Sequence, residues 1–107
     1  MGEAVRAIAA QYRLALQRAQ VQTGFTSRLA AHRALWDVLH RAEFLRGMLP
    51  EDAPQAEKDA LDTLFEYWSE IKHLPEEERI EWSPPSPPQL PERGIQSYLS
   101  TPGRINR

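Results

Sequence analysis

The chain has 107 residues, a net charge of −2 and no cysteine. This length is enough for one domain, and the lack of cysteine excludes disulfides and thiolate metal sites. No segment is apolar for long enough to act as a signal peptide or to cross a membrane. We therefore expect a protein without a membrane partner, located in the cytoplasm or in a phage particle.

Charge is distributed unevenly along the chain. Residues 1–49 hold seven arginines against three acidic residues, residues 50–82 hold three basic against eleven acidic residues, and residues 83–107 hold three arginines against one glutamate. The simplest interpretation is a basic helical segment packed beside an acidic one, within one chain or in a dimer. Eleven arginines against two lysines suggest a GC-rich bacterial or phage source.

Residues 3–22 have the apolar spacing of a helix, alternately three and four residues. A second row seven residues apart follows Ala7, Leu14 and Val21. The segment 23–27 then interrupts the pattern, because Gly24 is unfavourable inside a helix, and Thr26 or Ser27 is a candidate cap for a new helix. Whether the helix stops or bends there stays open. The main row is Val5, Ile8, Tyr12, Ala15 and Ala19.

Residues 27–49 carry the broadest apolar face. A face of this width implies neighbours on more than one side, so we expect a homo-oligomer or an obligate complex with another protein. Pro50 ends the segment. The row is Ala31, Leu35, Val38, Ala42, Leu45 and Leu49, and it is widened by Trp36, Leu39, Phe44 and Met48.

A third helix is predicted after Pro50. Asp52 and Gln55 form a capping-box pattern, with Asp52 at the N-cap and Pro54 in the first turn. Pro75, followed by Glu76, Glu77 and Glu78, predicts a short fourth helix with acids at the positive end of its dipole, and Ile80 and Trp82 would hold that turn against the body. The core face of the third helix is Leu61, Leu64, Phe65, Trp68 and Ile71.

The last 25 residues hold six of the nine prolines, from Pro84 to Pro102. Proline-rich backbone is extended and has no internal hydrogen bonds. The stretch 87–93 also matches apolar-Pro-x-apolar-Pro-x-Arg, a ligand type for SH3 grooves. Three interpretations stay open for this arm: a stiff strap on the body, a docking ligand, or a disordered tail. Ile95, Tyr98 and Leu99 form one apolar helical turn that would dock on a partner or on the body itself.

Chemistry-bearing patterns are sparse. Glu70 and His73 form a Glu-x-x-His step of the kind found in di-iron carboxylate bundles, where Glu66 and an acid of the facing helix, Glu43 or Asp37, would assist. A solvated helix end is the simpler interpretation, because a cation is favourable there. His32 and His40 are eight residues apart, which is not the spacing of a zinc helix. The sequence contains no nucleophile elbow or phosphate loop, so we expect no enzyme and no cofactor.

These patterns together predict an all-α protein: a helical hairpin or three-helix bundle over residues 1–82, and an extended proline-rich C-terminal arm over residues 83–107. The expected function is non-enzymatic protein–protein interaction within a bacterial or phage multi-subunit assembly, with another protein or a second copy as the partner. The expected contact residues are Trp82, Pro87, Pro88, Leu90, Pro91, Arg93, Ile95, Tyr98 and Leu99.

Three alternatives remain. One is a small regulator that blocks a larger enzyme. Another is a helical nucleic-acid binder, although the acidic net charge and the absence of lysine from residues 1–49 argue against it. The most distant is a di-iron carboxylate protein. The arginines of the nucleic-acid alternative are Arg28, Arg33, Arg41 and Arg46.

Overall fold

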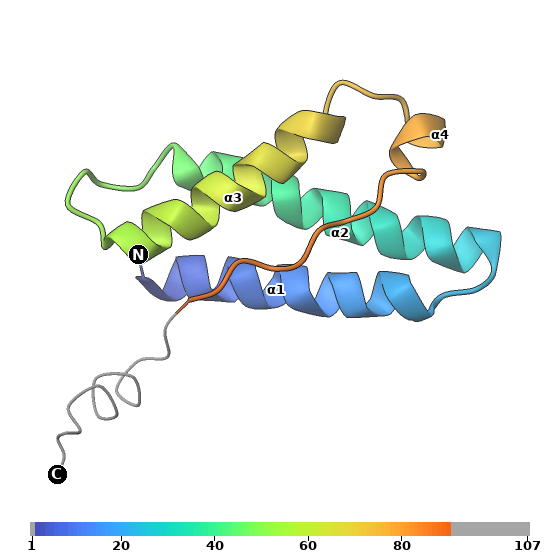
Figure 1. The fold of residues 1–107 in the computed structure, drawn as a ribbon, viewed down its shortest axis with the longest axis horizontal. Helices are drawn as coiled ribbons and strands as arrows, with labels where there is room; N and C mark the ends of the chain where they lie inside the picture. The colour runs from blue at the N-terminus through green and yellow to red at the C-terminus, as the bar shows by residue number, and fades with distance from the viewer. Residues whose placement is uncertain (1, 91–107) are drawn as a thin grey trace, which may run out of the picture.

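The computed structural model describes residues 2–90, which form three long helices and one short one (Figure 1). The three long helices pack against one another, and residues 2–90 contain no strand. The predicted all-α fold is therefore confirmed, in its three-helix form. The elements are α1 (Gly2–Val21), α2 (Phe25–Arg46), α3 (Gln55–Ile71) and α4 (Glu76–Arg79).

Helices α1 and α2 form an antiparallel hairpin (Figure 1). The helix does stop at the predicted interruption, because Gly24 has extended backbone geometry (φ −82°, ψ 148°) and is the N-cap of α2. The expectation that Thr26 or Ser27 caps this helix is wrong, since both lie inside its first turn. Because glycine has no side chain, no side-chain hydrogen bond caps the start of α2. All five residues of the main row of α1 are buried.

Helix α3 packs on the hairpin and closes the core (Figure 1). Leu35, expected in the core, is fully buried, and Trp68 retains only 8% of its exposure. Trp36 and Leu39 are also buried. Helices α1 and α3 of the same chain therefore cover these side chains of the broad apolar face of α2. The expected widening by Phe44 and Met48 is wrong: they are 73% and 55% exposed, because the helices packed on α2 leave both side chains uncovered.

The start of α3 differs from the predicted capping box. Pro54, not Asp52, is the N-cap, and it makes no side-chain capping bond. Asp52 instead belongs to a separate turn, in which the Ala53 N–H donates to the Pro50 carbonyl at 3.1 Å. The amide of Gln55 turns along the helix and donates to Asp59 at 2.9 Å. Proline at position 54 fixes the extended entry to the helix without help from a polar cap.

The predicted fourth helix is confirmed, with Pro75 as its N-cap and three glutamates in its first turn. Its last residue, Arg79, closes the carboxyl end of α3. The guanidinium of Arg79 donates to the carbonyls of Ile71 at 3.1 Å and Leu74 at 2.9 Å. It also lies over the rings of Trp36 at 5.2 Å and Trp68 at 5.4 Å. A cation is favourable at a helix carboxyl end, so Arg79 joins α4 to the core through charge and packing.

Candidate partner-binding site

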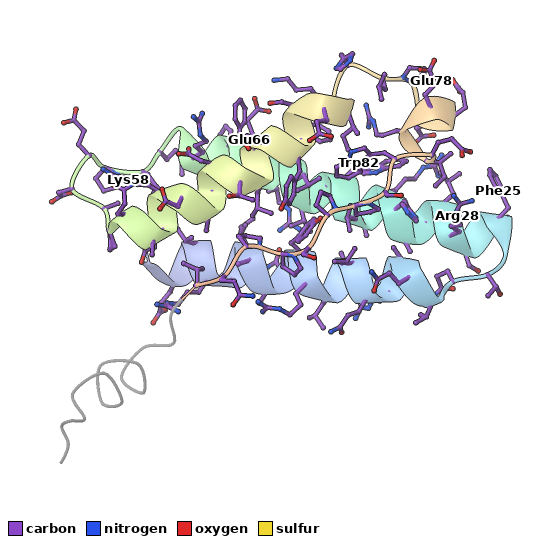
Figure 2. All side chains as sticks on the ribbon, viewed as in Figure 1. Phe25, Arg28, Lys58, Glu66, Glu78 and Trp82 are labelled. Atoms are coloured by element: carbon purple, nitrogen blue, oxygen red, sulfur yellow. The ribbon has the colours of Figure 1, made fainter. Side chains whose placement is uncertain are left out.

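Residues 83–90, which we call the strap, run back from α4 between α3 and α1 toward the amino-terminal end of α1 (Figure 1). The strap has neither helix nor strand geometry. Trp82 lies immediately before the strap in the chain (Figure 2). The indole N–H of Trp82 donates to Glu70 of α3 at 3.0 Å, and its ring lies 6.4 Å from that of Tyr67. The strap therefore starts from a side chain that is fixed on α3.

Two tyrosine hydroxyls hold the strap from opposite helices. Tyr12 of α1 donates to the carbonyl of Pro85 at 2.7 Å, and Tyr67 of α3 donates to the carbonyl of Ser86 at 2.9 Å. The two rings contact each other with centroids 5.9 Å apart. Because a polyproline backbone makes no internal hydrogen bonds, its carbonyls are free to accept from side chains. The tyrosine pair therefore suits a proline-rich segment.

Burial favours the protonated form of both tyrosine hydroxyls, which is the form that donates a hydrogen bond. Desolvation, followed by the neighbouring Tyr67, raises the pKa of Tyr12 well above its usual value. Desolvation, followed by the charges of Glu66 and Glu70, raises the pKa of Tyr67. Both hydroxyls therefore stay protonated, and keep donating to the strap, to a higher pH than an ordinary tyrosine would.

The far end of the strap reaches α1. Leu90 packs against the hydrophobic core, and Pro88 and Leu90 line a depression of about 300 Å³ with Arg6, Ala9 and Arg13. Pro87 is half-buried. Among the predicted contact residues, Trp82, Pro88 and Leu90 thus contact the chain's own body, as the strap interpretation expected. The other predicted contact residues lie outside the described residues: Pro91, Arg93, Ile95, Tyr98 and Leu99.

Sequence reasoning missed the role of Tyr12 and Tyr67 in holding the strap. The helical spacing assigns Tyr12 only to the apolar row of α1, and it is indeed fully buried. A buried tyrosine hydroxyl needs a hydrogen-bond partner, and this requirement was the available signal. It did not indicate which carbonyl would accept, because Pro85 lies 73 residues further along the chain.

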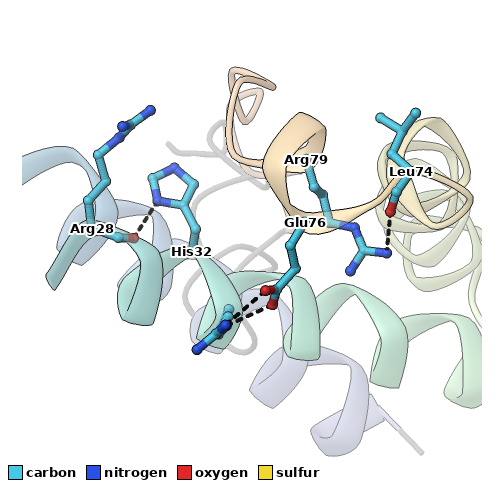
Figure 3. Close-up of polar contacts among 6 residues, drawn as sticks. Arg28, His32, Leu74, Glu76 and Arg79 are labelled. Carbon is cyan, nitrogen blue, oxygen red and sulfur yellow. Dashed lines mark hydrogen bonds and ion pairs between the residues drawn. The ribbon is translucent and has the colours of Figure 1, made fainter. Parts of the chain in front are cut away.

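The four arginines of the nucleic-acid alternative all contact the chain itself. Arg33 forms a two-pronged pair with Glu76, at 2.7 and 2.8 Å (Figure 3). Arg46 pairs with Asp62 at 2.7 Å, and Arg41 pairs with Asp37 at 3.1 Å. Arg28 donates to the carbonyl of Ile80 at 3.2 Å. The predicted packing of basic on acidic segments is confirmed within one chain, since the contacts of Arg28, Arg33 and Arg46 link α2 to α3 and to the α4 region.

Two of the residues considered for a di-iron site, Glu70 and Glu43, accept hydrogen bonds from other side chains. Glu70 accepts from Trp82, and Glu43 accepts from the Trp68 indole at 2.9 Å and from Lys72 at 3.0 Å. The bond from Lys72 is the main reason that the pKa of Glu43 is lowered. Within residues 2–90, no three His, Asp or Glu side chains gather closely enough to hold a metal ion.

Comparisons of the chain with protein families, with characterised proteins and with solved structures find no match. Within residues 2–90, no helix combines the length and the apolar character needed to cross a bilayer.

Proposed function

We propose that this protein is a non-enzymatic binding component of a multi-subunit assembly, and that it docks on another protein through residues 91–107. The helical body and the strap hold the start of this segment in a fixed position. The observation that supports the proposal is the fixed strap, because the bonds from Tyr12 and Tyr67 and the packing of Leu90 set the point from which the segment starts.

A fixed start favours docking for an entropic reason. Binding a segment costs free energy for every residue that becomes ordered. Residues 83–90 are already held on the body, so docking through the residues that follow does not have to order the strap as well. The two parts therefore have separate roles: Trp82, Pro88 and Leu90 position the segment, and the residues beyond Leu90 make the contact.

The chemistry of the segment defines the partner surface. Ile95, Tyr98 and Leu99 have the spacing of one apolar helical turn and require an apolar groove. Aromatic anchors often dominate the energy of such contacts, which assigns the central role to Tyr98. Arg93, just before the turn, favours a groove with an acidic rim.

The experiment compares baits. The full chain, a chain that ends at Leu90, and the Tyr98→Ala variant are immobilised and exposed to an extract of the cells that make the protein. We expect a protein retained by the full chain to be lost from the shortened chain and reduced by Tyr98→Ala. Ser97→Ala is the matched control within the segment and should retain it. Circular dichroism should show that the chain ending at Leu90 keeps its helices. Retention of the same protein by that chain would place the site on the helices instead.

A further inference from the structure

One side of the α1–α2 hairpin is covered by α3 and the strap, and the other side carries a groove. The groove has a volume of about 360 Å³. Its apolar lining consists of Leu14 and Ala15 of α1 with Ala31, Ala34 and Val38 of α2. Alanines at these positions leave room for a neighbouring side chain to approach the backbones closely.

Further apolar side chains are exposed on both helices of the hairpin. Leu14 is 52% exposed, and Val21, seven residues further, lies on the same side of α1 at 70%. On α2, Phe44 and Met48 are 73% and 55% exposed and line a separate depression with His40, Glu43 and Gly47. These four are among the five large hydrophobic residues that are exposed in residues 2–90. An apolar groove flanked by exposed apolar side chains such as Leu14 and Val21 is typical of an interaction site.

The face has a ridge and a hollow side by side. Leu14 projects from α1, and next to it Ala31 and Ala34 leave the surface of α2 low. In a two-fold dimer every contact occurs twice, so a surface that pairs a ridge with a hollow fits a copy of itself. We propose that a second copy of this chain binds here, so that each Leu14 fills the hollow over Ala31 and Ala34 of the other copy.

The size of the face supports a dimer. Helix α1 has 20 residues, which gives a length of about 30 Å. Two helices side by side are about 20 Å wide, so each copy offers about 600 Å² and the pair would bury about 1,200 Å². That is the lower limit of stable protein–protein interfaces. Weak, transient complexes are found at this end of the size range, so the dimer is expected to dissociate on dilution.

The charges of the groove rim also favour a second copy over a partner of one charge sign. The rim carries the basic Arg18 and Arg41 and the acidic Asp37, which is paired with Arg41 at 3.1 Å and whose side chain is 65% exposed. A strongly acidic helix would meet Asp37, and a strongly basic helix would meet the two arginines. A second copy of the chain presents both basic and acidic side chains, as this rim does. Neither the arginines nor Asp37 would then face like charge alone.

This inference does not rest on the proposed function, because the groove is argued from residues of α1 and α2 alone. A chain that ends at Leu90 should dimerise as the full chain does. If docking through the C-terminal segment fails in experiment, the dimer stands, and the reverse also holds.

Sedimentation equilibrium of the full chain over micromolar concentrations tests the proposal. We expect a monomer–dimer equilibrium whose dissociation constant rises about 100-fold or more in Leu14→Arg, because the substitution buries a charge at the centre of the interface in both copies. Phe25→Arg is the matched control: Phe25 is 66% exposed at the α1–α2 turn and does not line the groove (Figure 2). This variant should dimerise like the unaltered chain.

A second measurement covers the case in which Leu14→Arg disturbs folding. The chain has no cysteine, so Leu14→Cys protein can be mixed with Ala34→Cys protein and oxidised. The proposal requires a disulfide-linked heterodimer in good yield, and a Phe25→Cys and Ala34→Cys mixture should give little. A monomeric full chain at all concentrations, equal loss of dimer in both arginine variants, or equal cross-linking in both cysteine mixtures would overturn it.

Discussion

Removing the hydroxyl of Tyr12 should release part of the strap without disturbing the core. Tyr12→Phe keeps the ring, which is fully buried, and deletes the donor to Pro85 at 2.7 Å. A neutral hydrogen bond contributes about 0.5–1.5 kcal/mol net. Pro85 is half-buried, so water replaces only part of the lost bond, and we expect a loss of about 1 kcal/mol. For a domain of this size that corresponds to a melting temperature lower by about 4–8 °C.

Urea unfolding followed by circular dichroism measures this loss, and two comparisons define its origin. Tyr67→Phe should cost less, because its acceptor, Ser86, is exposed to water. In a chain that ends at Trp82 the acceptor is absent, so Tyr12→Phe should be neutral or stabilising there. An equal loss in the shortened and full chains would refute the assignment of this bond to the strap. So would a full-length Tyr12→Phe variant as stable as the unaltered chain.

Further expectations concern the core and the two ends of the pH range. Leu35→Ala should cost about 2–5 kcal/mol in urea unfolding, because a fully buried leucine leaves a cavity. Because the pKa of Tyr12 is raised in the folded state, its hydroxyl contributes fully to stability below about pH 10, and this contribution is lost as the pH rises further. Alkaline titration should therefore destabilise the Tyr12→Phe variant less than the unaltered chain. The bond from Arg33 lowers the pKa of Glu76, so the contribution of that pair is present above about pH 4.3 and lost on further acidification. Glu76→Gln should remove that part of the acid dependence in a pH-dependent melting series.

The sequence predicted most of the fold because the apolar periodicity was regular. The row of α1 and the core residues Leu35 and Trp68 followed directly from three-and-four spacing. The errors occurred where a local pattern had more than one solution. Asp52 fits a capping box, but its residues form a separate turn, and Phe44 continues an apolar row that its neighbours do not cover.

The candidate site was less predictable, because its contacts join residues far apart in the sequence. Periodicity places Tyr12 on a face, but only the fold brings it to Pro85, 73 residues away. Likewise, the second row through Leu14 was visible in the sequence. Its meaning depended on which side of α1 the third helix would cover, and spacing along one helix carries no information on that choice.

Docking through residues 91–107 is tested most directly by competition. A synthetic peptide of these residues is titrated against the complex between the full chain and the protein that it retains. We expect the peptide to displace the chain, and the Tyr98→Ala peptide to require about 5- to 150-fold more, as for loss of an aromatic anchor of about 1–3 kcal/mol. If the peptide never displaces the chain, while an excess of the chain ending at Leu90 does, the partner binds the helices and the proposed function is wrong.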